Sequence, residues 1–112
     1  MQIYSKWEAN SVTANQYSID ELAEIIALIA KKYGIASVYL FGSCARGDST
    51  EASDIDLRID KGQLCGLFAL GGFYADVAEA LQTEVDVLTT GSLDESFLQS
   101  ISKDEVLLYE AK

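Results

Sequence analysis

The sequence predicts one small domain of the α/β or α+β class, in which helices cover a single sheet. Its 112 residues are 49% hydrophobic, which suits one compact core and leaves no room for a second. Segments with helical periodicity alternate with short β-branched segments, in the order helix, strand, strand, helix, strand, helix. No internal repeat or linker interrupts this order.

The N-terminal segment and the first helix differ in pattern. Residues 1–17 are polar and mixed without a clear period, so they form an N-terminal extension with no assigned role, and 18–112 form the domain. Ser18 and Glu21 have the spacing of a capping box, and apolar residues follow at helical spacing as far as Tyr33. Gly34 is expected to end this helix.

Three segments have the composition of strands. Residues 35–41 are β-branched and aromatic and lie between two glycines, which predicts a buried strand. Residues 54–60 alternate strictly, which puts apolar side chains on one face and charged ones on the other. The apolar set is Ile55, Leu57 and Ile59, and the charged set is Asp54, Asp56, Arg58 and Asp60. Residues 83–90 predict a third strand, with Asp86 between Val85 and Val87.

The second half of the chain contains two more helical patterns. In residues 62–82 a helical face is formed by Phe73, Val77 and Leu81, but glycines weaken its first half, so we expect a break or close packing there. A closely packed helix is the favoured interpretation of this glycine-rich stretch, and an apolar partner surface is the alternative. Residues 92–103 predict a helix, and residues 105–110 a short strand or extended tail.

Composition excludes several kinds of chemistry. Histidine is absent, which removes Ser/His/Asp triads, Cys/His pairs and His-ligated zinc, so any catalysis depends on carboxylates. The formal net charge of −10 repels phosphate backbones, so we expect no direct nucleic-acid binding and favour a basic protein partner. Without a long apolar run or a signal-like N-terminus we expect a cytoplasmic protein that is not bound to membrane, with Cys44 and Cys65 as thiols.

Three features are candidates for a site, and each has a commoner structural explanation. Gly42 and Ser43 form a turn between a strand and a short helix, which suits phosphate binding but is more often only a capped turn. Asp54 and Asp56 point the same way and suit hard cations such as Mg²⁺, although such pairs are more often solvated. Asp86 is more often exposed on an outer face.

The combination of these features changes the interpretation. If the strands are neighbours, Asp54, Asp56 and Asp86 converge at one end of the sheet, beside the turn at Gly42. At about 4 Å and an effective dielectric near 20, each carboxylate pair repels by about 4 kcal/mol. This is comparable with the stability of a small domain, so bound cations or proton uptake are expected.

The motif resembles that of the polymerase-β-like nucleotidyltransferase superfamily. It consists of Gly42 and Ser43, ten intervening residues, Asp54 and Asp56, and then Asp86 on a later strand. The surrounding sequence GSCARGDSTEASDIDL is similar to that of the minimal nucleotidyltransferases, the MntA-type antitoxins encoded beside HEPN-domain toxins. The resemblance covers the chain from about residue 18 to its end and implies a small mixed sheet flanked by helices.

The same resemblance implies roles for individual residues. Gly42, Ser43 and Arg46 would hold the triphosphate of ATP. The catalytic residues Asp54, Asp56 and Asp86 would bind two Mg²⁺ ions, and Asp86 would also help to deprotonate the acceptor hydroxyl. Cys44 lies at a variable position of the motif and is expected to pack. Arg58 and Asp60 lie outside the metal positions and are interpreted as a surface pair.

The implied activity is transfer of AMP from ATP to a tyrosine hydroxyl of a HEPN ribonuclease toxin, which would inactivate the toxin. The chain shows no additional acceptor domain, so the acceptor is expected on another protein, in a hetero-oligomer with the toxin. Two alternatives stay open. One is an antitoxin that neutralises the toxin by binding alone, and the other is a transferase acting on a small molecule such as an aminoglycoside.

Overall fold

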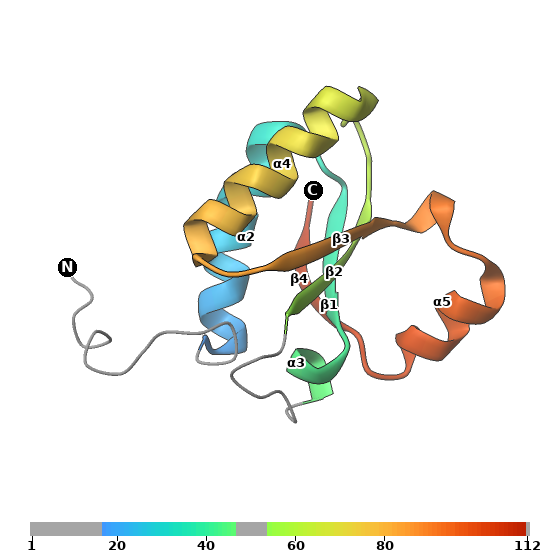
Figure 1. The fold of residues 1–112 in the computed structure, drawn as a ribbon. Helices are drawn as coiled ribbons and strands as arrows, with labels where there is room; N and C mark the ends of the chain where they lie inside the picture. The colour runs from blue at the N-terminus through green and yellow to red at the C-terminus, as the bar shows by residue number, and fades with distance from the viewer. Residues whose placement is uncertain (1–16, 47–53, 112) are drawn as a thin grey trace.

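A computed structural model describes residues 17–46 and 54–111, which form a mixed sheet with the two longest helices on one face (Figure 1). The sheet has four strands in the order β3-β2-β1-β4. The strand β1 is antiparallel to β2 and β4, whereas β2 and β3 are parallel. In chain order the elements are α2 (Ile19–Tyr33), β1 (Ser37–Phe41), α3 (Ser43–Arg46), β2 (Ile55–Asp60), α4 (Gly66–Leu81), β3 (Val85–Thr89), the short 3-10 helix η2 (Thr90–Ser92), α5 (Glu95–Ser102) and β4 (Val106–Glu110).

The first helix has the ends that the sequence predicts. The Ser18 hydroxyl accepts a hydrogen bond from the Glu21 amide at 3.0 Å, and the Glu21 carboxylate accepts one from the Ser18 amide at 2.8 Å. Gly34 ends the helix with φ 71° and donates from its N–H to the Ala30 carbonyl. Both ends of α2 therefore have partners for backbone groups that a helix leaves unpaired.

The glycine-rich helix α4 is continuous over 16 residues, so the expected break is wrong and the expected close packing is right. A side chain at Gly72 would place its Cβ 2.8 Å from the Tyr33 hydroxyl, so the glycine allows α2 and α4 to approach closely. Phe73 is fully buried between the helices and the sheet. At the start of the same helix, Leu67 and Phe68 are 84% and 98% exposed, and the apolar partner surface stays a prediction.

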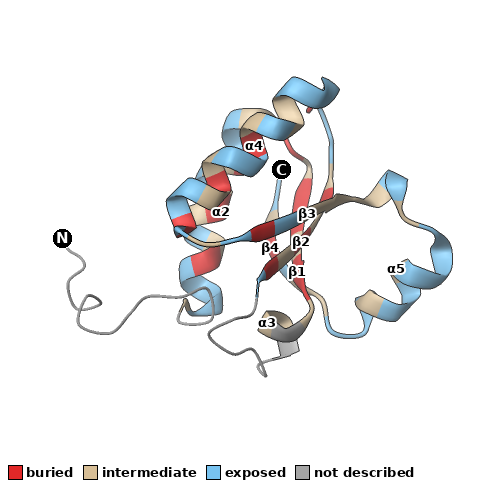
Figure 2. Ribbon diagram, viewed as in Figure 1, coloured by how far each residue is buried: buried red, intermediate tan, exposed pale blue. Residues whose placement is uncertain are grey.

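The hydrophobic core lies between the sheet and the pair α2 and α4, where the buried segments face one another (Figure 2). Alternate residues of β2 point into this core, and all three apolar residues of the strand are completely buried. The remaining residues of β2 therefore lie on the opposite face, which we call the open face of the sheet. The helix α5 lies apart from α2 and α4, beyond the other side of the sheet (Figure 1).

The two ends of the described chain also contribute to the domain. Tyr17, which the sequence assigned to the extension, donates from its hydroxyl to the Leu81 carbonyl at 3.0 Å, so it is attached to the end of α4. Residues 1–16 of the predicted extension lie outside the described residues. Residues 106–110 form the edge strand β4 and not a tail. Within 17–46 and 54–111, no helix is long and apolar enough to cross a membrane.

Candidate active site

Asp56 and Asp86 are direct partners in the parallel pairing of β2 and β3. The preceding pair in the same register, Ile55 and Val85, is buried in the core. Because side chains alternate along a strand, burial of that pair directs both carboxylates to the open face. Asp56 is half-buried there and Asp86 is exposed. The structure therefore brings together carboxylates that are 30 residues apart in the sequence, as the pattern predicted.

Asp54 lies immediately before β2 and is exposed. Its carbonyl accepts a hydrogen bond from the Cys44 thiol at 3.6 Å, which connects the start of β2 to α3. Cys44 packs against the core, which confirms the expectation for this residue. Among the described residues, no group of three or more Asp, Glu, Cys or His side chains is gathered closely enough to hold a metal ion. The set of three metal-binding aspartates thus stays a prediction built around one observed pair.

Gly42 lies directly against the Asp56 carboxylate. Its φ of 79° is in the left-handed region that favours glycine, and a Cβ built at this position would overlap the Asp56 side chain. The turn and the carboxylates therefore form one site, although 13 positions separate Gly42 from the start of β2. Ser43 and Arg46 begin and end α3, and their side chains lie outside the described part of the structure.

A buried ion pair lies on the same face, next along β2. Arg58 donates to both oxygens of Glu105, with its Nη2 2.9 Å from Oε1, and the two side chains are only 11% and 9% exposed. Its guanidinium also stacks 4.2 Å from the centre of the Tyr39 ring. The bonds to the Glu105 carboxylate raise the pKa of Arg58 above its ordinary value. This network joins β1, β2 and the residue before β4 directly beside the carboxylate pair.

The predicted surface pair of Arg58 and Asp60 is corrected by this network. The two side chains do form an ion pair, at 3.6 Å, but Arg58 is mostly buried and its main partner is Glu105. Burial alone would raise the pKa of Asp60, but hydrogen bonds from Ser37 and Thr90 and the charge of Arg58 outweigh it and lower that pKa. Sequence reasoning missed Glu105. The one sequence signal for such a partner was the charge of Arg58 on a strand whose neighbouring residues are apolar and buried.

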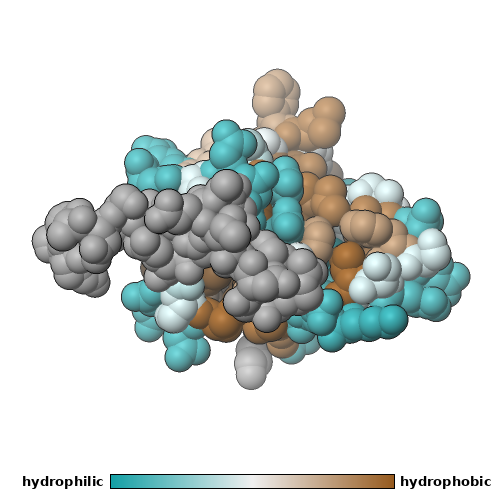
Figure 3. Space-filling view, turned by 60° about the horizontal axis from the view of Figure 1, so that its bottom comes forward, coloured by the Kyte–Doolittle hydropathy of each residue, from teal (hydrophilic) through white to brown (hydrophobic). Residues whose placement is uncertain are grey.

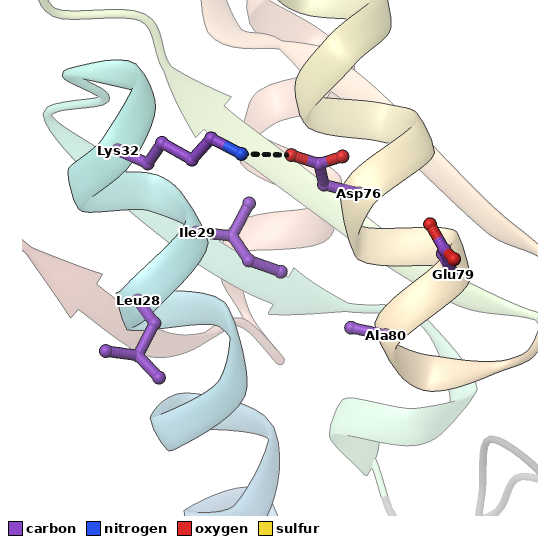
Figure 4. Close-up of a pocket in the computed structure, with 6 residues that line it drawn as sticks. All are labelled: Leu28, Ile29, Lys32, Asp76, Glu79 and Ala80. Atoms are coloured by element: carbon purple, nitrogen blue, oxygen red, sulfur yellow. Dashed lines mark hydrogen bonds and ion pairs between the residues drawn. The ribbon is translucent and has the colours of Figure 1, made fainter.

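A shallow groove of about 400 Å³ lies elsewhere, between α2 and α4 (Figure 4). An ion pair of 3.1 Å between Lys32 and Asp76 crosses it, and the Tyr33 hydroxyl donates to the same carboxylate at 2.7 Å. These helices cover the opposite face of the sheet from Asp56 and Asp86, so the groove is separate from the carboxylate site. Its lining residues are Leu28, Ile29, Lys32, Asp76, Glu79 and Ala80.

Comparison with known protein families identifies the group to which this site belongs. The family model described as "Polymerase beta, Nucleotidyltransferase" matches residues 23–112, which include the turn, the carboxylates and the whole sheet. The chain belongs to this nucleotidyltransferase family. The resemblance inferred from the motif at residues 42–56 is therefore confirmed, and the predicted enzyme class, nucleotidyltransferase, is that of the family.

Curated relatives and solved structures are similar over most of the chain. "Putative protein adenylyltransferase MJ0435" of Methanocaldococcus jannaschii is 34% identical over 80% of this chain and 91% of its own length. "Putative protein adenylyltransferase MJ0126" of the same organism is 31% identical over 82% of this chain and 97% of its own length. The solved "Structure of putative minimal nucleotidyltransferase" superposes with a TM-score of 0.68 at 23% identity, over 75% of this chain and 86% of the other.

Two further solved structures with a similar fold are of toxin–antitoxin proteins. "Crystal structure of the toxin-antitoxin with AMP-PNP" has a TM-score of 0.68 at 22% identity, over 80% of this chain and 74% of the other. A structure described as a tri-AMPylated Shewanella oneidensis HEPN toxin in complex with MNT antitoxin has a TM-score of 0.64 at 19% identity, over 84% and 74%. At these identities the similarity establishes the fold, and it confirms the predicted mixed sheet flanked by helices.

Proposed function

We propose that this nucleotidyltransferase transfers AMP from ATP to a tyrosine hydroxyl of a HEPN-domain ribonuclease toxin and so acts as its antitoxin. The observation that carries the proposal is the pair Asp56 and Asp86, with Gly42 packed against the first of them. Relatives named protein adenylyltransferase support transfer to a protein, and neighbours with AMP-PNP and with an AMPylated HEPN toxin support ATP and the acceptor class.

The carboxylate pair would be the centre of the site for the two Mg²⁺ ions that the motif implies. Hard divalent cations take oxygen ligands, and Asp56 and Asp86 supply carboxylates side by side on an accessible face. Asp54, one step before the strand, would complete the set. When bound, the two ions would supply charge neutralisation for the attacking and leaving oxygens of the phosphoryl group.

The remaining roles fall to the turn and to Asp86. Gly42 carries no side chain, which lets the turn lie against the Asp56 carboxylate, and the backbone of this turn would approach the triphosphate. Ser43 and Arg46 would bind the phosphate oxygens. Asp86 is the more exposed carboxylate of the pair, so it would reach the incoming tyrosine hydroxyl and accept its proton. The net charge of −10 favours a toxin with a basic surface around its acceptor tyrosine.

The test is transfer of labelled AMP from ATP to the purified HEPN protein in the presence of Mg²⁺. Wild type is compared with Asp56→Asn and Asp86→Asn. Glu79→Gln, in the groove between α2 and α4 on the opposite face of the sheet, is the control for removing one negative charge. We expect label on the toxin with wild type and with the control, and none with either Asn variant. Peptide mapping by mass spectrometry should find the label on tyrosine.

The other outcomes assign the alternatives. Label that persists in Asp56→Asn would refute the proposed site. Toxin inhibition that survives both Asn variants without any label would indicate an antitoxin that acts by binding alone. Label found on an added aminoglycoside and not on the toxin would indicate a small-molecule transferase. Circular dichroism of each variant shows that the fold is kept.

A further inference from the structure

An aromatic pair borders the carboxylates on the open face of the sheet. Phe41, the last residue of β1, is the antiparallel partner of Asp56, so both side chains lie on the same face. Phe41 is 7% exposed, and it lies outside the core cluster under α2 and α4. It is covered instead by Phe97 of α5, with ring centres 6.3 Å apart and planes at 90°.

Phe97 is the accessible member of this pair. Phe97 is 39% exposed, and none of the residues of α5 is buried. An aromatic ring that is partly exposed offers a flat apolar surface to a ligand. In Figure 3, which turns the lower end of the molecule toward the viewer, apolar side chains (brown) are exposed to the right of the centre, beside the mostly hydrophilic right-hand side.

The position of Phe97 relative to the carboxylates suits a nucleoside. Neighbouring strands are about 5 Å apart, and with the 6.3 Å between the rings this puts Phe97 on the order of 11 Å from Asp56. It lies on the β1 side of Asp56, whereas Asp86 lies on the β3 side. A nucleotide whose phosphates are held at Gly42 and the carboxylates would therefore extend its ribose and base toward Phe97.

We propose that Phe97 is the stacking platform for the base of the bound nucleotide, braced edge-on by Phe41. This inference rests on the proposed function for its ligand. Base stacking on an aromatic ring accepts any base because every base has a π-face. Phe97 has no hydrogen-bonding group, so it fixes the position of the base and does not select its identity. Because the Phe97 ring already packs against Phe41, binding of the base costs little additional side-chain entropy.

The test compares the affinity for ATP with that for tripolyphosphate, which carries the phosphates without a base, both with Mg²⁺ present. The variants are Phe97→Ala and Phe97→Trp, and Phe68→Ala is the control because Phe68 is a more exposed phenylalanine at the far end of α4. Phe97→Ala should weaken ATP binding by about 5- to 100-fold and leave tripolyphosphate binding unchanged. Phe97→Trp should bind ATP as tightly as wild type, and Phe68→Ala should change the affinity for neither ligand.

Each remaining outcome decides against this assignment or against the proposed function. Equal loss of ATP and tripolyphosphate binding in Phe97→Ala would mean that the ring only supports the fold, and no loss would mean that the base lies elsewhere. Discrimination between ATP and GTP that disappears in Phe97→Trp would contradict a base-tolerant platform. Wild type that binds neither ligand overturns both proposals, whereas normal binding without labelling of the toxin overturns the proposed function alone.

Discussion

Gly42→Ala is the substitution that most directly tests how the site is built. Gly42 has φ 79°, and an alanine in this left-handed region costs about 1–2 kcal/mol. The new Cβ would also overlap the Asp56 carboxylate, which would have to rotate away or move with its strand. We expect the free energy of unfolding to fall by about 1–3 kcal/mol, with strain and displacement both contributing.

Gly66→Ala provides a matched control for the backbone strain. Gly66 also has a positive φ, 88°, but a Cβ built there meets no atom within 4 Å. It begins α4, at the opposite end of β2 from Asp56 (Figure 1). Gly66→Ala should therefore carry the strain alone, and the difference between the two variants measures the overlap with the carboxylate.

Two measurements separate these contributions. Urea unfolding gives the stability of each variant, and calorimetric titration with Mn²⁺, a stand-in for Mg²⁺, reports on the carboxylates. Gly42→Ala should lose stability and bind Mn²⁺ at least tenfold more weakly, whereas Gly66→Ala should lose stability and keep its affinity. If Gly42→Ala binds Mn²⁺ as wild type does, the close contact between the turn and Asp56 has no part in building the site, and the reasoning fails.

Three further predictions concern the sheet and the core. Glu105→Ala leaves the buried Arg58 charge without its partner and should lower the free energy of unfolding by urea by about 3–5 kcal/mol. The double variant Arg58→Met with Glu105→Leu should recover most of this loss. If Glu105→Ala is as stable as wild type, the ion pair does not have the buried character described above. Phe73→Ala should cost about 3–5 kcal/mol and the exposed Leu67→Ala less than about 0.5, an order that thermal unfolding checks. Folding lowers the pKa of Asp60, so the ionised carboxylate contributes to stability above about pH 4, and this contribution is lost on further acidification. Asp60→Asn should therefore flatten the dependence of the unfolding free energy on pH between about 5 and 3.

The local elements were predictable because their signals are local. The capping box at Ser18 and the left-handed glycine at Gly34 satisfy backbone groups within one turn, so the ends of α2 follow from a few adjacent residues. The alternation along β2 has the period of a strand, and no helix could bury Ile55, Leu57 and Ile59 on one face. Neighbouring carboxylates followed from the same alternation once the strands paired.

The features that escaped prediction depend on contacts between distant segments. Arg58 and Glu105 are 47 residues apart, and the sequence indicates that Arg58 needs a partner but not that this partner is Glu105. The glycines of α4 weaken a helix by intrinsic propensity, yet Gly72 lets Tyr33 approach the helix closely, a tertiary contact that propensity does not reveal. Phe97 is an ordinary apolar residue of a helical pattern, and its place beside Phe41 emerges only when α5 folds against the open face.

The charge of the site is imposed by the core beneath it. Burying Ile55, Leu57, Ile59 and Val85 is worth about 1.5–3 kcal/mol for each side chain, or roughly 6–12 kcal/mol together. Neighbouring strands lie about 5 Å apart, and at that separation and an effective dielectric near 20 two carboxylates repel by roughly 3 kcal/mol. A shift of the register by one residue would relieve that repulsion but would expose the apolar set, so the core determines the register. The carboxylates are thus held together by a larger free energy than separates them, and a bound divalent cation would relieve the repulsion without any rearrangement of the sheet.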